Sequence, residues 1–525
     1  MTLCLSQLLT HGGKTSDNAV AISDKSGELS YGELIGLVQN VSNGVIQAGA
    51  RKNDRVAVYL PKQIETVATM FGAAQAGCVF VPVNPLLKPA QVEHILTDCD
   101  VRILVTSRSR AAGLKSILKN CPSLEQLILI DDPKTFEASQ SIATWDDFIG
   151  APSVPSHRVI DSDMVSILYT SGSTGKPKGV VLSHKNMVTG AFSVSEYLQN
   201  TPQDKLLAVL PFSFDYGFSQ LSTAFCRGAS VSLMEYLMPN DVIRKVASER
   251  ITGLAGVPPL WNQLAALEWP EEATAHLRYI TNSGGAMPKV TLASLMKSLP
   301  STEPYLMYGL TEAFRSTYLP PDQIEQRPES IGKAIPNAEI MIVTDEGKLA
   351  EPGETGELVH RGSLVALGYW NSPEKTAERF KPVPSIEEGL VMDEIAVWSG
   401  DRVRIDSEGY LYFVGRRDEM IKTSGYRVSP NEVEEAIFST GLVSEAVALG
   451  AADEQIGQSI AVVVMASPGG EKNTDALMLA LRQELANFML PKHVIWLDDM
   501  PRNANGKIDR SGIAKQLPEL LKDAG

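Results

Sequence analysis

Cysteine is scarce in this chain of 525 residues, and its few thiols are scattered. None of them belongs to a C-x-x-C pair or to the His/Cys spacing of a metal site. The five cysteines are Cys4, Cys78, Cys99, Cys121 and Cys226. The pattern excludes a cysteine-based metal motif, and we expect reduced thiols in a cytoplasmic protein.

Long apolar runs and basic clusters are also missing. No apolar run approaches the about 20 residues that span a bilayer. The first 18 residues lack a basic segment followed by an apolar core, so we expect no signal peptide. The net charge is −15, and no Lys/Arg cluster suggests a nucleic-acid or lipid surface. An acidic chain can still carry a locally positive site for an anionic substrate.

The order of expected elements predicts an α/β fold with two or more domains. Strand-like runs at 55–60 and 79–83 flank a helix-like stretch at 64–75, an alternation typical of parallel sheets covered by helices. Near Gly353, short strands and Gly-rich turns predict an antiparallel, barrel-like module. We expect two mixed sheet and helix subdomains plus this module in 1–416, a hinge at 417–418, and a small mobile α+β domain in 419–525.

The most specific motif is "YTSGSTGKPKGVVLSH" at 169–184, which directly follows the strand-like "MVSILY". Glycines let backbone N–H groups approach a phosphate, and hydroxyls and lysines add donors. The motif is not a Walker A loop, because its spacing differs and Pro177 prevents an immediate helix. The alternative is a flexible linker. The expected phosphate-binding residues are Thr170, Ser171, Gly172, Ser173, Thr174, Gly175, Lys176 and Lys178.

This loop resembles the phosphate loop of AMP-forming, adenylate-forming enzymes, which include acyl-CoA synthetases, amino-acid adenylation domains and luciferases. Four further blocks match in order: "NSGGAMP" (282–288), "YGLTEA" (308–313), "WSGDRV…GRRDEMIKTSGYRVSPNEVE" (398–434) and "PRNANGKIDR" (501–510). The resemblance covers essentially the whole chain. Within the superfamily the chain is most similar to exosortase A-associated acyl-CoA ligases.

The resemblance implies a role for each block. Thr311 and Glu312 would hold the phosphates of ATP and Mg²⁺, with Glu312 as the metal ligand. Lys507, on the mobile domain, would neutralise the carboxylate and the α-phosphate and leave for the second half-reaction, after rotation at a hinge on Asp418. Further residues are expected around the nucleotide and the thiol: Gly284, Gly285, Ala286, Tyr308 and Gly309 for the base, Asp401 and Arg416 for the ribose, Arg427 for phosphate, and Gly425 for the thiol tunnel.

The acyl pocket departs from the usual pattern, because "LPFSFDYGFSQL" (210–221) carries an acid, Asp215, among aromatic residues. A buried acid needs a cation, and Arg315 is a further unusual residue of this wall. Asp215 could bind a substrate amine while Arg315 binds a carboxylate. Alternatively the two could pair with each other, or both could lie exposed at a channel mouth. The other expected pocket residues are Tyr216, Ser219, Gly256, Ser283 and Met307.

We therefore expect a ligase that works in two steps. A carboxylate and MgATP give acyl-AMP and pyrophosphate, and a phosphopantetheine thiol then displaces AMP. The acceptor would be CoA or a free-standing carrier protein acting in trans, the substrate an amino or amino-dicarboxylic acid, and the chain a monomer or homodimer. The alternatives are a conventional medium-chain or branched acyl-CoA synthetase, an adenylating oxygenase and a non-catalytic ATP-binding protein.

Overall fold

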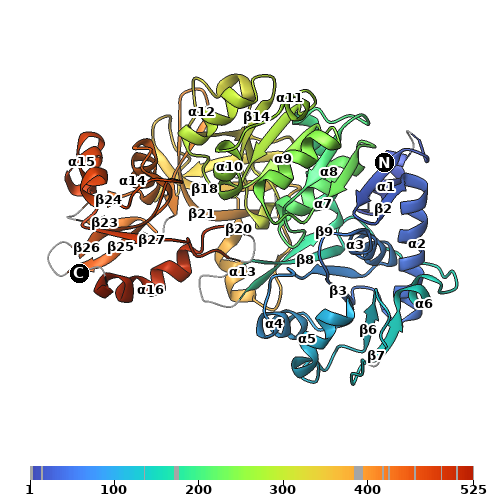
Figure 1. Cartoon of the computed structure of the whole chain (residues 1–525). Helices are drawn as coiled ribbons and strands as arrows, with labels where there is room; N and C mark the ends of the chain where they lie inside the picture. Colours follow the sequence, from blue (N-terminus) through green and yellow to red (C-terminus); the bar gives the residue numbers. More distant parts are fainter. Residues whose placement is uncertain are drawn as a thin grey trace, which may run out of the picture.

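The computed structural model describes residues 4–13, 16–134, 136–170, 177–383, 394–416, 419–423, 426–453, 457–485, 487–503 and 506–523. Its described strands form three sheets, of which the small third one lies at the opposite side of the molecule from the N-terminus (Figure 1). Helices cover the sheets, so the expected α/β fold with a large N-terminal and a small C-terminal part is confirmed. No helix in these ranges is both long and apolar enough to cross a membrane.

The largest sheet has 14 described strands and joins a parallel half to an antiparallel half. Its strand order is β17 (Ala338–Val343), β18 (Thr355–Gly362), β21 (Ile395–Ile405), β22 (Leu411–Arg416), β16 (Ser330–Ala334), β15 (Thr317–Leu319), β14 (Glu303–Tyr308), β13 (Tyr279–Asn282), β12 (Gly253–Gly256), β10 (Lys205–Ala208), β11 (Ser230–Leu233), β1 (Val20–Asp24) and β2 (Gly27–Ser30), with β20 (Phe380–Pro382) beside β21. The antiparallel module expected near Gly353 is thus bonded to the parallel strands through β15 and β16.

The other two sheets are smaller. The described strands of the second are, in order, β19 (Gly368–Tyr369), β9 (Lys178–Ser183), β8 (Met164–Thr170), β4 (Val79–Pro82), β3 (Arg55–Tyr59), β5 (Val101–Thr106), β6 (Gln126–Leu129) and β7 (Ser141–Thr144). Those of the third are β24 (Tyr426–Val428), β23 (Ile421–Thr423), β26 (Gly457–Ala466) and β25 (Val443–Asp453), with β27 (His493–Leu497) beside β26.

The helices of the N-terminal part are α1 (Gln7–Gly13), α2 (Tyr31–Gln47), α3 (Ile64–Ala76), α4 (Pro89–Asp98), α5 (Arg108–Leu118), α6 (Trp145–Ile149), α7 (His184–Tyr197), α8 (Asp215–Phe225), α9 (Pro239–Ser248), α10 (Pro258–Ala265), α11 (Glu271–Thr274), α12 (Lys289–Ser298) and α13 (Pro373–Arg379). Those of the C-terminal part are α14 (Pro430–Ser439), α15 (Thr474–Glu484) and α16 (Arg510–Asp523).

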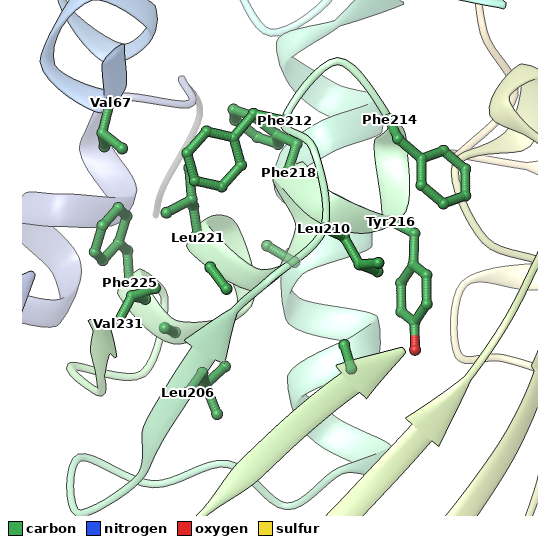
Figure 2. Packing of buried hydrophobic residues seen from close by; sticks show 14 of the residues in the cluster. Val67, Leu206, Leu210, Phe212, Phe214, Tyr216, Phe218, Leu221, Phe225 and Val231 are labelled. Atoms are coloured by element: carbon green, nitrogen blue, oxygen red, sulfur yellow. The ribbon is translucent and has the colours of Figure 1, made fainter. Parts of the chain in front are cut away.

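Helix α8 is buried along its whole length between the two large sheets. The ring of Phe218, which Figure 2 shows within the cluster of buried hydrophobic residues, belongs to this packing. It stacks on Phe80 of β4 and on Phe71 of α3, with centroid distances of 5.3 and 5.9 Å. The strand before α8, β10, ends at Ala208. Pro211 has no N–H for a ladder, and its carbonyl instead accepts from Phe214 N in the turn before α8.

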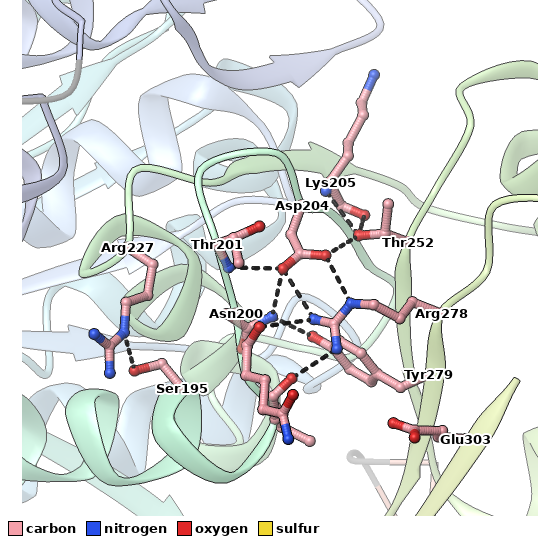
Figure 3. Close-up of polar contacts among 12 residues, drawn as sticks. Ser195, Asn200, Thr201, Asp204, Lys205, Arg227, Thr252, Arg278, Tyr279 and Glu303 are labelled. Carbon is pink, nitrogen blue, oxygen red and sulfur yellow. Dashed lines mark hydrogen bonds and ion pairs between the residues drawn. The ribbon is translucent and has the colours of Figure 1, made fainter.

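An ion pair around the buried carboxylate of Asp204 joins the amino ends of three parallel strands. Asp204, before β10, accepts from Arg278, before β13, at 2.9 Å, and from the hydroxyl of Thr252, before β12, at 2.7 Å (Figure 3). Burial acts to raise the pKa of Asp204, but Arg278 and the hydrogen bonds outweigh it and leave the pKa below its usual value. These contacts tie the amino ends of the strands together. In open α/β sheets ligands bind at the carboxyl ends of the strands.

Candidate active site

The expected base and ribose residues meet at the carboxyl end of β14. The hydroxyl of Tyr308, the last residue of β14, donates to Oδ2 of Asp401 on β21. Asp401 is 8% exposed, whereas Tyr308 is half-buried and packs its ring 6.1 Å from Phe413. The fold thus brings together an aromatic face and a carboxylate that are 93 residues apart. This is the pair of groups that the sequence predicts for an adenosine.

A second cluster surrounds the carboxylate of Glu312 in the short 3₁₀ helix η1 (Thr311–Ala313). Tyr369 donates its hydroxyl to Oε1 of Glu312 at 2.6 Å, and Lys178 Nζ lies 3.3 Å from the same oxygen and 2.7 Å from the Tyr369 hydroxyl. Strand pairing fixes the arrangement, because Lys178 begins β9 and Tyr369 ends β19, which lies beside β9. The predicted residues Glu312 and Lys178 are therefore in direct contact.

The charge state of Glu312 suits a metal ligand. Burial acts to raise the pKa of Glu312, but Lys178 and the Tyr369 hydroxyl outweigh it and hold the pKa below its usual value. The carboxylate therefore stays ionised at neutral pH. One ionised carboxylate fits Mg²⁺, which takes one or two protein oxygens together with phosphates and water. The described residues contain no cluster of three His, Cys, Asp or Glu side chains that would suit a metal held by protein alone.

The phosphate loop itself lies largely outside the described residues, which include Thr170 and resume at Pro177. Among the predicted phosphate-binding residues, those outside are Ser171, Gly172, Ser173, Thr174, Gly175 and Lys176. The hydroxyl of Thr170 is buried at the end of β8 and has no hydrogen-bond partner among the described residues. A buried polar group of this kind requires an explanation, and a phosphate oxygen would supply its partner.

On the acyl side, Asp215 and Arg315 pair with each other. Oδ2 of Asp215 accepts from Nη1 of Arg315 at 2.5 Å, and Oδ1 accepts from the Thr311 hydroxyl at 3.0 Å. The residues are 3% and 1% exposed. Among the alternatives left open by the sequence, the structure shows this ion pair, and an exposed channel mouth is wrong for both residues. The guanidinium also lies over the ring of Tyr216 at 4.7 Å.

The chain reaches Arg315 through a strained turn. Phe314 has φ 56° and ψ −46°, and Arg315 N donates to the carbonyl of Ala313, two residues back, which defines a γ-turn. A bulky residue in this conformation costs about 1–3 kcal/mol. The Phe314 ring is fully buried against Gly190 of α7, where a methyl group would come within 2.4 Å of it. The turn at Phe314 places the side chain of Arg315 beside Asp215.

The remaining predicted pocket residues make contacts with other protein groups. Tyr216 shares a 2.5 Å hydrogen bond with the Thr281 hydroxyl, and Met307 accepts a bond from Tyr197 at 2.9 Å. Ser219 lies 3.4 Å from the Thr223 hydroxyl one helical turn along α8. Ser283 is also buried. A methyl group on Gly256 would come within 2.6 Å of the Trp261 ring, so that glycine makes room for protein, as Gly309 does for the backbone of Arg315.

Lys507 of the C-terminal part reaches this region. Its Nζ lies 4.2 Å from the ring centroid of Phe214, the residue before Asp215. A methyl group on Gly284 would come within 2.7 Å of the same nitrogen, so the space at Gly284 faces Lys507. Gly285 and Ala286 are exposed. Lys507 thus contacts the N-terminal part, and its role toward the carboxylate and the α-phosphate stays a prediction.

Some predicted residues have little or no description. Asp418 and Gly425 lie outside the described residues. Arg416 and Arg427 are described only as members of strands, Arg416 opposite Asp401 and Arg427 opposite Lys422. Their assigned roles stay predictions.

Two residues of the site were not singled out from the sequence. Tyr369 follows the other members of its cluster by 57 and 191 residues, and its Gly-Tyr-Trp context carries no chemical signal. Phe214 was visible only as a neighbour of Asp215. Aromatic residues in apolar runs are usually core, so only the fold distinguishes these two.

The chain belongs to the AMP-binding enzymes. A family model described as "AMP-binding enzyme" matches residues 9–370, and one described as "AMP-binding enzyme C-terminal domain" matches residues 432–507. The predicted membership of the adenylate-forming superfamily is thereby confirmed.

Relatives of known name cover nearly the whole chain. Gramicidin S synthase 2 of Aneurinibacillus migulanus is 28% identical over 98% of this chain, which spans only 11% of that protein. Indoleacetate–CoA ligase of Aromatoleum aromaticum is 27% identical over 97% of both chains. The crystal structure of an anthranilate CoA ligase with anthranoyl-AMP superposes with a TM-score of 0.88 at 24% identity, covering 99% of this chain and 98% of that one, which shows the shared fold.

Proposed function

We propose that this protein activates a carboxylic acid with MgATP and transfers the acyl group to a phosphopantetheine thiol. The contact of Lys507 with Phe214 and Gly284 carries the proposal, because it brings a cation from the small C-terminal part beside the acyl side of the large one. Indoleacetate–CoA ligase, which this chain matches over nearly its full length, supports CoA as the acceptor. A carrier protein in trans is the alternative acceptor, and the narrower resemblance to exosortase A-associated ligases stays a prediction.

Adenylation brings two anions together, so the task of the protein is to position them and neutralise charge. A line of contacts runs from Lys507 through Phe214 to its neighbour Asp215, and from Asp215 through Thr311 to its neighbour Glu312. Lys507 would neutralise the reacting carboxylate and α-phosphate. Mg²⁺ at Glu312 would supply charge neutralisation on the remaining phosphates.

When Mg²⁺ binds Glu312, Lys178 would exchange its contact with that carboxylate for a phosphate oxygen. Lys178 is 22% exposed and Glu312 15%, so this pair can open to a ligand. Tyr369 would keep the carboxylate oriented throughout, because its hydroxyl bonds both partners. Tyr308 and Asp401 would hold the base and the ribose.

The second half-reaction needs Lys507 to leave. We propose that the chain divides at 417–418, with Asp418 as the hinge, and that rotation of 419–525 replaces Lys507 by the segment containing Gly425 and Arg427. These residues would then approach the thiol and the phosphate. Asp418→Pro should impair one half-reaction and spare the other.

For the substrate, we propose an acid that carries an amine, and in its fullest form an amino-dicarboxylic acid. Two oxygens of Asp215 already accept one bond each, and a carboxylate has about four lone-pair sites, so an ammonium group could join Arg315 and Thr311 there. Nε and Nη2 of Arg315 are buried and have no hydrogen-bond partner among the described residues, so they could donate to a second carboxylate after Tyr216 moves.

Exchange of pyrophosphate into ATP, measured over a panel of acids, tests both levels. Adenylation requires exchange that depends on an acid. If none of the acids in the panel supports exchange, the proposed function is wrong. If octanoate exceeds every amino acid by orders of magnitude, the chain is a conventional acyl-CoA synthetase and the amine proposal fails. In addition, Asp215→Ala should raise KM for an amine-bearing acid.

Lys507→Ala tests the lysine. Exchange should fall by about 100-fold or more, as for other removed charge donors, while thioester formation from supplied acyl-AMP continues. Lys515→Ala, an exposed lysine on α16 of the same domain, is the matched control and should change neither step. Equal loss of both steps in Lys507→Ala would refute the role.

A further inference from the structure

The ammonium group of Lys507 lies in a slot with two walls. One wall is the ring of Phe214, whose centroid is 4.2 Å from Nζ. The other is the backbone of Gly284, where a methyl group would come within 2.6 Å of Cε and 2.7 Å of Nζ. Gly284 also has φ +79°, so a side chain there would be strained as well as crowded. The slot therefore fits the end of a lysine closely.

Phe214 is an unexpected residue for its place in the fold. It occupies the N-cap of α8 and makes no side-chain cap bond, although Ser, Thr, Asp and Asn stabilise such positions best. Figure 2 shows its ring directed away from the rings of Phe212 and Phe218, toward the side where Tyr216 lies. Phe214 and Tyr216 meet edge to face at 6.0 Å. The ring thus offers an aromatic face to Lys507 at the cost of a cap.

Backbone and side-chain hydrogen bonds join Lys507 to Asn503, four residues before it in this loop. Asn503 N donates to the carbonyl of Lys507 at 2.8 Å, and Lys507 N donates to the side chain of Asn503 at 3.1 Å. Arg502, at the start of the loop, pairs with Glu445 of β25. The two bonds to Asn503 restrain the backbone of Lys507, and the slot restricts the movement of its long side chain.

We propose that Phe214 is a positioning residue for adenylation, which holds the Lys507 ammonium by a cation–π contact and favours the conformer in which the small domain is closed for the first half-reaction. The inference rests on the proposed function. The attraction arises because the ring face is negative, and it is stronger where water is excluded, as it is beside a ring only 7% exposed. The contact must break before a thiol reaches the acyl group, so weakening it should slow adenylation without slowing thioester formation.

Replacement of Phe214 by mono-, di- and trifluorophenylalanine tests the proposal, because fluorine withdraws the negative charge of the face with little change in shape. We expect the rate of pyrophosphate exchange to fall stepwise, by about 3- to 30-fold in total, which corresponds to the range of cation–π energies at partly to fully desolvated sites. Thioester formation from supplied acyl-AMP should not fall. The same series at Phe212, whose ring packs on the other side, is the control and should leave exchange flat.

Phe214→Leu allows a double-mutant cycle with Lys507→Ala. It should lower exchange in the wild-type background but cause no further loss in a Lys507→Ala background, since the two residues act through one contact. A flat fluorine series at Phe214, or equal loss from Phe214→Leu with and without Lys507, would overturn the proposal.

Hydrogen exchange of the 502–510 segment in the free protein gives a readout that needs no activity. Deuterium uptake should be faster in Phe214→Leu than in the wild type and unchanged in Phe212→Leu; equal uptake in all three would overturn the proposal. If the wild type shows the expected protection but activates no acid, the proposed function fails and the contact between Phe214 and Lys507 stands.

Discussion

The two sides of the site hold a carboxylate in opposite ways. Glu312, on the phosphate side, shares Lys178 and Tyr369 in a cluster whose charged side chains are 15% and 22% exposed. Asp215, on the acyl side, binds Arg315 in a pair whose side chains are only 4% and 2% exposed. The two carboxylates are connected by a single residue, Thr311, which donates to Asp215 and precedes Glu312.

The difference separates a contact that can open from one that supports the structure. A part-exposed ion pair contributes little to stability, so Lys178 can leave Glu312 for a ligand at small cost. A buried pair contributes little as a whole, but losing one partner leaves an unpaired charge in an apolar region. On the phosphate side, Lys178 can therefore leave Glu312 for a ligand. On the acyl side, a ligand that displaces Arg315 from Asp215 must itself supply a compensating positive charge.

The largest expected effect is on stability. Arg315→Met should lower the free energy of unfolding by about 3–5 kcal/mol, because Asp215 stays buried without its cation. Lys178→Met should lower it by less than about 1 kcal/mol. Urea unfolding measures both. Arg315→Met combined with Asp215→Leu should recover most of the loss, and failure to recover would show that the charge of Asp215 is not its source.

For activity we expect the larger effect on the phosphate side, at Glu312, and the smaller one on the acyl side, at Asp215. Glu312→Gln removes the ionised oxygen that would hold Mg²⁺, so pyrophosphate exchange should fall by about 100- to 1,000-fold with unfolding unchanged. Asp215→Asn should affect KM for the acid more than kcat. Steady-state exchange at saturating ATP distinguishes the two, and a larger fall in kcat for Asp215→Asn would reverse the assignment of the two sides.

A pH effect is expected from the acyl side. Burial lowers the pKa of His360 to about 3, and its Nδ1 lies 3.0 Å from the hydroxyl of Ser316, next to Arg315. In the unfolded chain the His360 imidazole has its ordinary pKa of about 6.5. The folded protein therefore has its full stability above that pH, and the free energy of unfolding falls as the pH drops from 6.5 toward 3. Between pH 7 and 5 the loss from His360 should be about 2 kcal/mol. In His360→Gln the fall over this range should shrink accordingly, and an unchanged fall would contradict the assignment.

The smallest effect is expected at Tyr369. Tyr369→Phe removes the hydroxyl that bonds both Glu312 and Lys178, so exchange should slow by about tenfold, with kcat affected more than KM for ATP. Tyr412→Phe removes a similar bond to Asp406 in the antiparallel module and is the control. Equal loss in both variants would show that Tyr369 has no special place at Glu312.

Much of this site could be predicted because each block of the sequence is local. The strand and helix pattern of 55–83 follows from local periodicity. The nucleotide roles of Tyr308 and Asp401 came from the resemblance of their blocks, whereas their contact across 93 residues depends on the fold. Tyr369 could not be found, since its contact with Glu312 depends on the register of β19 against β9. The partner of Asp215 stayed open for the same reason, because it depends on the dihedral angles of one residue, Phe314, which no propensity favours.

That γ-turn also bears on how the protein could be redesigned. Substrate range is usually altered one pocket residue at a time, but Arg315 owes its direction to Phe314, and Phe314 owes its space to Gly190. A single substitution of Arg315 would therefore keep the strained turn and place the new side chain against the carboxylate of Asp215. Residues 190, 215 and 313–316 form one interchangeable cassette, to be transplanted together when a different acid is wanted.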